Sequence, residues 1–358
     1  MSRALDPSVK EALGNGRHAD VFEQVATVFS TTQQQHGYLE IEILPRSHAV
    51  DESAHFLQDG RFVAIPRLRL AQAFLHARRI LASSLSQSGE PVAGDDDELQ
   101  SSTAVILLMD PEHLTAANTR KRLLLRKRQS QAAGSAGYRE RLARESFVLN
   151  SLLTSRLHRH TKSPVLWNHK RWLLRQMEQA ELPVDTAHEF ERVICVAAER
   201  HARNYHAWSY ARDVMALRTS REGRGTGQPD TGAGEIVALV ARWCRLHHDD
   251  ISGWSFLLHL ALLFPSRAAG VFDDVVSLTE KYRWRNESVW HFVRNAALVP
   301  GVHQVQVQPT DEARVTRVWK MLRREVAEEG DLEARMLEAK ILDRAAGYIG
   351  VDPDSWRA

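Results

Sequence analysis

Cysteine is scarce in this sequence, and long apolar runs are missing. The two cysteines among 358 residues, Cys195 and Cys244, lie in apolar helical stretches, so we interpret them as buried free thiols and not as a disulfide framework. No stretch approaches the roughly 18 uninterrupted apolar residues of a membrane span. The first ten residues also lack the apolar segment of a signal peptide. The sequence therefore predicts a cytoplasmic protein without a transmembrane segment.

An excess of either charge is also missing. Lys and Arg total 47 against 45 for Asp and Glu, a formal net charge of +2. This balance gives no overall attraction to nucleic acid or to an acidic membrane. One local exception is residues 120–128, where six of nine residues are basic. Such a run could bind nucleic acid or acidic headgroups, but we favour a solvated or partner-facing helix and expect no nucleic-acid partner.

Strand signals are nearly absent after residue 100. Before it, we expect a short helix over 21–29, an extended segment over 38–44 and an amphipathic helix over 68–85. Residues 86–100, with their acidic run at 95–98, are expected to form a solvated loop, and the glycine-rich residues 221–234 a surface linker. We expect no metal site in this chain, because adjacent residues such as His247 to Asp250 diverge on a helix.

A repeat centred on tryptophan organises the rest of the chain. Four segments align on Trp167, Trp208, Trp254 and Trp290, and a fifth has Ala117 in that place, at spacings of 36 to 50 residues. Such spacing suits one helical hairpin per unit, with the tryptophans filling the seams between stacked hairpins. The expected fold is all-α, a right-handed α-α superhelix or TPR-like solenoid. We divide it into an N-terminal extension (1–100), five repeats (101–300) and C-terminal capping helices (301–358).

These units resemble the protein prenyltransferase α-subunit repeat, whose pattern is roughly Lys-Asn-Tyr-x-x-Trp-x-x-Arg-Arg. The likeness covers about residues 101–300 and is strongest over 161–174 and 202–215. Arginines follow the tryptophan in three repeats, at Arg171, Arg212 and Arg294. Three further segments, 40–45, 115–121 and 162–164, are similar to the branch of α-like subunits of geranylgeranyltransferase type III.

The resemblance implies a function as well as a fold. In the family the α solenoid wraps around a separate β subunit, an α/α barrel that holds the isoprenoid pocket and a catalytic zinc. The α subunit supplies polar side chains to the diphosphate, and the aligned positions are Lys162, as the catalytic residue, with Asn204, Tyr205 and His206. A cation and hydrogen-bond donors stabilise the negative charge that develops as diphosphate departs. The resemblance thus implies that the chain transfers an isoprenoid, with geranylgeranyl as the expected group, to a protein cysteine only together with a β subunit.

Departures from the repeat pattern leave other interpretations of the site residues and of the function open. Ala117 replaces a tryptophan, Pro164 replaces a tyrosine donor, and the repeat at Trp254 lacks its arginine. Lys162 could be a solvated charge, Asn204 a helix cap, and Tyr205 and His206 packing residues. The alternative function is a non-catalytic helical-repeat scaffold that binds proteins; an RNA-binding solenoid rests on the basic run alone.

Overall fold

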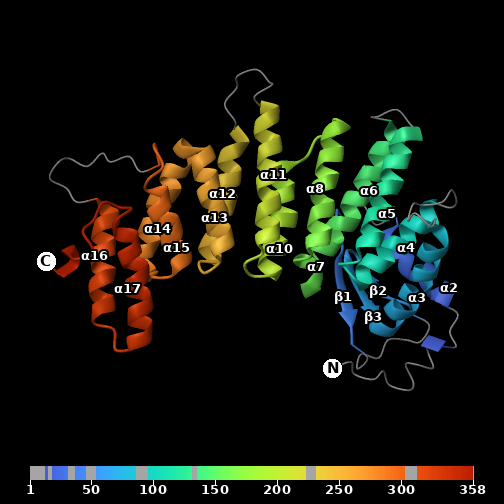
Figure 1. Cartoon of the computed structure of the whole chain (residues 1–358), viewed down its shortest axis with the longest axis horizontal. Helices are drawn as coiled ribbons and strands as arrows, with labels where there is room; N and C mark the ends of the chain where they lie inside the picture. Colours follow the sequence, from blue (N-terminus) through green and yellow to red (C-terminus); the bar gives the residue numbers. More distant parts are fainter. Residues whose placement is uncertain are drawn as a thin grey trace. The chain divides into compact units, whose positions relative to one another are not determined.

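The computed structural model of this chain describes residues 13–14, 18–30, 37–45, 54–85, 96–130, 135–222, 231–302 and 313–357 (Figure 1). It divides into two compact units. The first comprises Met1–Asp185 with Glu199–His201, and the second comprises Thr186–Ala198 with Ala202–Ala358. Helices dominate both units, which confirms the all-α helical-repeat fold expected from the sequence. No helix in the described ranges is long and apolar enough to cross a membrane.

The first unit begins with helices packed beside a small sheet. Helix α2 (His18–Ala26) continues into the 3-10 turn η1 (Thr27–Phe29), and α3 (Arg67–Ser84) packs on α2, so both N-terminal helices expected from the sequence are present. The extended segment is β1 (Glu40–Leu44). The sequence analysis missed its partners, β2 (Leu57–Asp59) and β3 (Phe62–Pro66), which complete a sheet in the order β1-β3-β2. Strand β3 is parallel to β1 and antiparallel to β2.

Helical hairpins make up the rest of the first unit. Their elements are α4 (Asp96–Met109), α5 (Leu114–Ser130), α6 (Ala136–Leu153), the single turn α7 (His158–Thr161) and α8 (Pro164–Gln179). The expected loop over 86–100 is wrong at its C-terminal end, because Asp96, Asp97 and Glu98 form the first turn of α4. Acidic side chains are favourable there, since they face the positive end of the helix dipole. Residues 86–95 lie outside the described part.

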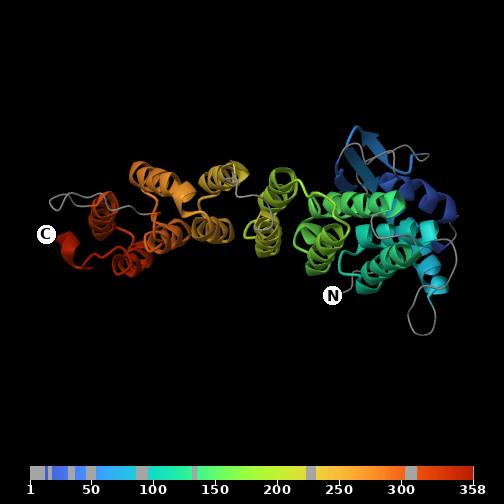
Figure 2. The ribbon, with the colours of Figure 1, turned by 90° about the horizontal axis from the view of Figure 1, so that it is seen from above.

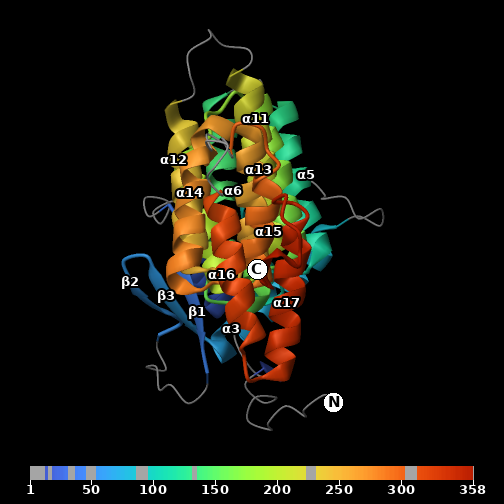
Figure 3. The same ribbon diagram turned by 90° about the vertical axis from the view of Figure 1, so that its left-hand side faces the viewer.

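The second unit stacks its helices in two layers (Figures 2 and 3). Helix α12 packs on α14 and α14 on α16, while α11 packs on α13, α13 on α15 and α15 on α17. The elements are α9 (Thr186–His188), the π-helical η3 (Glu189–Ile194), α10 (Cys195–Arg200), α11 (Tyr205–Glu222), α12 (Thr231–Leu246), α13 (Ile251–Leu263), α14 (Pro265–Tyr282), α15 (Glu287–Ala296), α16 (Arg314–Ala327), α17 (Leu332–Ala346) and the terminal turn η4 (Ser355–Arg357).

The glycine-rich linker is shorter than the sequence suggested. Helix α11 extends to Glu222 and α12 already begins at Thr231, so both flanks of the expected linker over 221–234 are helical. The central residues, 223–230, lie outside the described ranges. Glycines at 232 and 234 are therefore accommodated within the first turn of a helix, where packing of the following apolar face compensates for their low helix propensity.

Tryptophans join neighbouring hairpins of the second unit. Trp208 on α11 lies with its ring centroid 4.9 Å from Trp243 on α12 and 5.3 Å from Phe256 on α13. Trp254 on α13 approaches Phe292 on α15 at 5.5 Å. Each repeat tryptophan, Trp167 and Trp290 included, is at most 1% exposed. Burial of side chains of this size supplies a large share of the packing free energy that holds a solenoid together.

Candidate functional site

Each repeat has a helix cap at the same place, four residues before its central residue. The caps of the four tryptophan repeats are Ser163, Asn204, Asp250 and Asn286, and their side-chain oxygens accept bonds from backbone N–H groups one turn ahead. In the repeat centred on Ala117, the imidazole Nδ1 of His113 accepts from the N–H of Ala116 at 3.1 Å. The cap fixes where the second helix of each hairpin begins, and so determines the register of the residues around it.

Lys162 is exposed on a firmly held stretch of backbone in the first unit. It follows α7, between the buried residues Thr161 and Ser163. The indole Nε1 of Trp167 donates to the carbonyl of Thr161 at 2.8 Å, and the hydroxyl of Ser163 donates to the carbonyl of Pro111 at 3.1 Å. The side chain of Lys162 has no hydrogen bond or ion pair within the described ranges. A cation is thus presented on a rigid support just before the N-terminus of α8.

Pro164 begins α8 at its first helical position. Proline suits that position because its missing N–H would have no partner inside the helix and its φ angle is already helical. The substitution of the family's tyrosine therefore removes a side-chain donor beside Lys162 but strengthens the start of the helix. The same sequence position in the next repeat is Tyr205, which retains its hydroxyl.

Asn204, Tyr205 and His206 lie together at the start of α11 in the second unit. Asn204 is buried, and its side chain is occupied: Nδ2 donates to the carbonyl of Ala197 at 3.2 Å, and Oδ1 accepts from the N–H of Ala207 at 3.3 Å. These bonds favour the capping role for Asn204. Tyr205 is 66% exposed, with its ring centroid 4.1 Å from that of half-buried His206. Two accessible polar rings therefore lie three and two residues before Trp208, whereas the position equivalent to Lys162 in this repeat is Arg203.

The three repeat arginines have different environments. Arg171 is half-buried and donates to Oδ1 of Asn168 at 3.2 Å. Arg212 donates to the carbonyl of Ser255 at 3.3 Å and lies 5.6 Å from the centroid of the Phe256 ring, so it links α11 to α13. Arg294 is buried and pairs with Glu287 at 2.5 Å. Arg212 therefore links two hairpins of the second unit, whereas Arg294 pairs within its own helix, α15.

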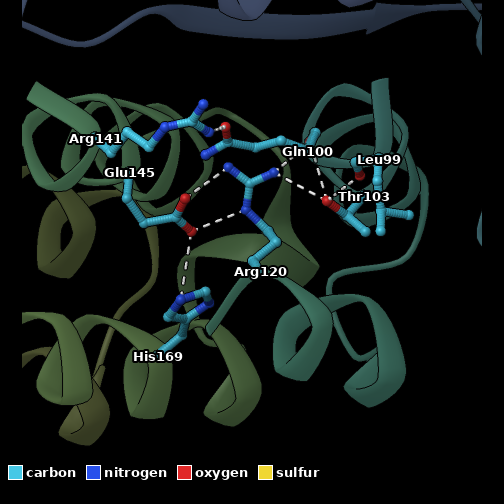
Figure 4. Close-up of polar contacts among 7 residues, drawn as sticks. All are labelled: Leu99, Gln100, Thr103, Arg120, Arg141, Glu145 and His169. Atoms are coloured by element: carbon cyan, nitrogen blue, oxygen red, sulfur yellow. Dashed lines mark hydrogen bonds and ion pairs between the residues drawn. The ribbon is translucent and has the colours of Figure 1, made fainter. Parts of the chain in front are cut away.

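A buried ionic network in the first unit was not anticipated from the sequence (Figure 4). Arg120 and Glu145, both at most 1% exposed, form a bidentate ion pair with distances of 2.8 Å and 2.7 Å. The remaining nitrogen of Arg120 donates to the carbonyl of Gln100 at 2.5 Å and to the hydroxyl of Thr103 at 3.1 Å. The network ties α4, α5 and α6 together.

Charge and burial act against each other in this network. Burial is the largest single effect and works to raise the pKa of Glu145, but the charge of Arg120 together with hydrogen bonds from Arg120 and Gln100 outweighs it, and the pKa is lowered from its usual value. His169 on α8 lies with Nε2 3.3 Å from Oε1 of Glu145, and burial lowers the pKa of its imidazole to about 3. His169 is therefore neutral at pH 7. The contact completes the packing around the carboxylate without adding a second ion pair.

Lys170 occupies the matching position one repeat later. Arg120 lies three residues after Ala117, and Lys170 lies three residues after Trp167. Lys170 is 2% exposed and donates to Oδ1 of Asn150 at 2.6 Å and to the hydroxyl of Ser146 at 3.2 Å. Lys170 is thus a second buried cation with partners on α6. The sequence shows that Arg120 and Lys170 share a position in their repeats. It does not show their partners, which are distant in sequence.

The basic run on α5 is largely used within the molecule. Arg120 belongs to the buried network, Arg126 pairs with Asp96, and Arg128 donates to Oε1 of Gln179 at 2.7 Å. Lys121 lies 5.9 Å from the centroid of the Trp172 ring, and burial lowers its pKa. These contacts give the run a structural role between helices.

Asp250 makes a testable link between two repeats of the second unit. One carboxylate oxygen caps α13, and the other accepts from the N–H of Arg203 at 2.6 Å, where the backbone has a left-handed φ of 57°. We expect Asp250→Ala to lower the free energy of unfolding by about 1–2 kcal/mol, the upper range for loss of a cap. Urea unfolding of the variant measures this loss. The neighbouring Asp249→Ala is the control, and equal midpoints for the two variants would contradict the assignment.

Comparisons with known proteins agree with the resemblance predicted from the sequence. Residues 166–282 match the family described as the ECM9 middle domain. Protein prenyltransferase alpha subunit repeat-containing protein 1 of Danio rerio is 27% identical over 184 residues, which cover 46% of this chain and 38% of that protein. Its Homo sapiens counterpart is 26% identical over 236 residues, covering 61% of this chain and 50% of that protein.

A third relative, protein prenyltransferase alpha subunit repeat-containing protein 1-A of Xenopus laevis, is 26% identical over 202 residues, which cover 51% of this chain and 41% of that protein. The chain thus spans half or less of the length of the relatives it matches. The resemblance predicted from the tryptophan motifs is confirmed: this chain is a distant relative of the proteins that carry the prenyltransferase α-subunit repeat.

Proposed function

We propose that this chain is the α-like subunit of a heterodimeric protein prenyltransferase, which transfers an isoprenoid, geranylgeranyl by our inference, to a protein cysteine in the cytoplasm. The observation that carries the proposal is Lys162. It combines the register of the family's diphosphate lysine with exposure, a rigid backbone and a side chain without a partner in the described ranges. A cation without a competing carboxylate is suited to an anionic ligand.

The proposed roles follow from what each side chain has available. Lys162 would stabilise the charge on the departing diphosphate, which is the charge that grows as the bond to the isoprenoid carbon breaks. Tyr205 would donate its exposed hydroxyl to a diphosphate oxygen, and His206 would donate a ring N–H. Asn204 would act indirectly, by fixing the first turn of α11 from which both rings project.

The zinc of such an enzyme would belong to the partner. Among the described residues, no group of three or more His, Cys, Asp and Glu side chains is placed to hold a metal ion. Both cysteines are buried, and burial raises the pKa of the Cys244 thiol well above its usual value, which disfavours the thiolate that binds zinc. We therefore assign thiol activation of the substrate cysteine to the β subunit.

Association with a β subunit is the first test of this proposal. We expect the chain to elute with a prenyltransferase β-type subunit as a stable heterodimer on size-exclusion chromatography, with an interface above about 2,000 Å², as is usual for permanent complexes. Neither chain alone should prenylate a cysteine-containing protein. A chain that remains separate from every β-type subunit of its own organism would contradict the proposal.

A second candidate function is a non-catalytic scaffold that binds proteins. The observation that favours it is the loss of hydrogen-bond donors at positions that the family uses for the diphosphate: Pro164 has no hydroxyl, and the amide of Asn204 is committed to capping. A scaffold would form the heterodimer but would not support transfer. The transfer assay described in the Discussion separates the two functions, because only the enzyme subunit supports transfer in the wild-type heterodimer.

A further inference from the structure

A groove lies on the outer surface of the second unit, between the segment α9–η3 and helix α12. Its volume is about 650 Å³, and all of its lining residues belong to this unit. On its other side α12 packs directly on α14 (Figure 3). Apolar side chains line the groove, among them Ala187 on α9 and Ala238, Leu239 and Leu246 on α12. Leu246 is 75% exposed, although its size would favour burial.

The groove is lined mainly by a stripe of α12 that lies beside the stripe facing the core. The core stripe contains Val240 and Cys244, both at most 1% exposed, and buried Ile236 lies where the two stripes meet. The groove residues of α12 begin at Glu235 and continue at intervals of three and four residues to Leu246, which places them on one helix face. This face extends for about 16 Å, or three helical turns. Leu239 and Leu246, seven residues apart, have the spacing of anchor positions in helix-in-groove recognition.

Charges at the two ends of the groove have opposite signs. Glu235 lies near the N-terminus of α12, whereas Arg242 and Arg245 lie near its C-terminus. Within the ranges that the structure describes, neither Glu235 nor Arg242 has an ion-pair partner. Arg245 reaches Asp274 at 3.6 Å and keeps a partly exposed guanidinium. Glu191 on η3 also lines the groove and lies 3.9 Å from Arg192 of the same segment. Along α12 the apolar lining therefore has an acidic end and a basic end.

We propose that this groove binds an amphipathic α-helix of a partner protein, oriented antiparallel to α12. Helices favour acidic residues in their first turn and basic residues in their last turn, because these charges complement the helix dipole. In the antiparallel orientation, the acidic first turn meets Arg242 and Arg245, and the basic last turn meets Glu235. The apolar face of the helix covers Leu239 and Leu246. The proposal does not depend on prenyl transfer.

Two synthetic peptides of about four helical turns test the occupant and its direction. Both carry leucines at helical spacing and a lactam staple; one has an acidic first turn and a basic last turn, and the other has these charges exchanged. Fluorescence polarisation with the full chain should show at least about tenfold tighter binding of the first peptide, because like charges across an interface are strongly unfavourable. Equal affinity for the two peptides would overturn the proposal.

Variants locate the binding on the groove. Leu246→Glu should lower the affinity for the first peptide by about tenfold or more, since a carboxylate replaces an apolar anchor. The matched control is Leu262→Glu on α13, also an exposed leucine, which should leave the affinity unchanged. The double reversal Glu235→Arg with Arg242→Glu should invert the preference between the peptides. An affinity for the first peptide that is unchanged by Leu246→Glu would overturn the proposal. So would a dimer of this chain that Leu246→Glu dissociates, because the occupant would then be a second copy.

Discussion

Replacement of Glu145 by leucine is expected to lower the free energy of unfolding by about 3–5 kcal/mol, because it leaves the buried guanidinium of Arg120 without its counter-charge. Both side chains of the pair are at most 1% exposed, so water cannot solvate the remaining charge. Urea unfolding followed by circular dichroism measures the loss. Glu140→Leu, at an exposed position of the same helix, is the control and should change stability by less than about 0.5 kcal/mol.

A double variant distinguishes the ion pair from simple packing. Arg120→Met with Glu145→Leu removes both charges and keeps similar volume, so we expect it to be more stable than Glu145→Leu alone. If the loss of unfolding free energy in the double variant equals the sum of the losses in Arg120→Met and Glu145→Leu, the two residues act independently, and the ion pair would add no coupling energy. Such additivity is the rule only for residues without shared contacts.

Trp208→Ala should destabilise the chain by about 3–5 kcal/mol, the usual loss when a buried tryptophan is truncated. The side chain is 1% exposed and packs on both Trp243 and Phe256 from the next hairpin. Its indole N–H has no hydrogen-bond partner in the described ranges, so the loss reflects packing alone. Differential scanning calorimetry of the full chain measures the change.

The control for Trp208→Ala comes from the same helix. Tyr205, one turn earlier, is 66% exposed, and Tyr205→Ala should change stability by less than about 0.5 kcal/mol. A stability loss of similar size for both substitutions would mean that the tryptophan does not hold the seam between hairpins.

The helical repeats could be predicted because tryptophan marks a fixed place in each unit. A buried residue of that size recurs at 167, 208, 254 and 290, and the caps four residues earlier keep the register through loops of different length. Even the repeat centred on Ala117 keeps its cap, through His113. Signals of this kind can be recognised in the sequence because each depends only on residues near the start of one helix.

Other features depend on contacts that sequence order hides. The hairpin of β2 and β3 is short, and β2 is entirely exposed, so alternation of apolar residues is visible only in β3. The pair Arg120–Glu145 joins residues 25 positions apart on different helices. For the candidate site, the position of Lys162 in its repeat was enough to predict it from the sequence. The capping role of Asn204 became clear only from its hydrogen bonds to Ala197 and Ala207 in the structure.

Single-turnover prenyl transfer by the heterodimer tests the proposed function most directly. With a β-type subunit, geranylgeranyl diphosphate and a cysteine-containing protein, we predict that Lys162→Ala slows transfer by about 10²–10³-fold, the effect of removing one preorganised donor at a developing charge. Heterodimer recovery should be unchanged because Lys162 is exposed, and Lys340→Ala, at another exposed lysine, should transfer at the wild-type rate. Transfer by Lys162→Ala at the wild-type rate would contradict the role of Lys162, and the absence of transfer by the wild-type heterodimer would favour the scaffold function.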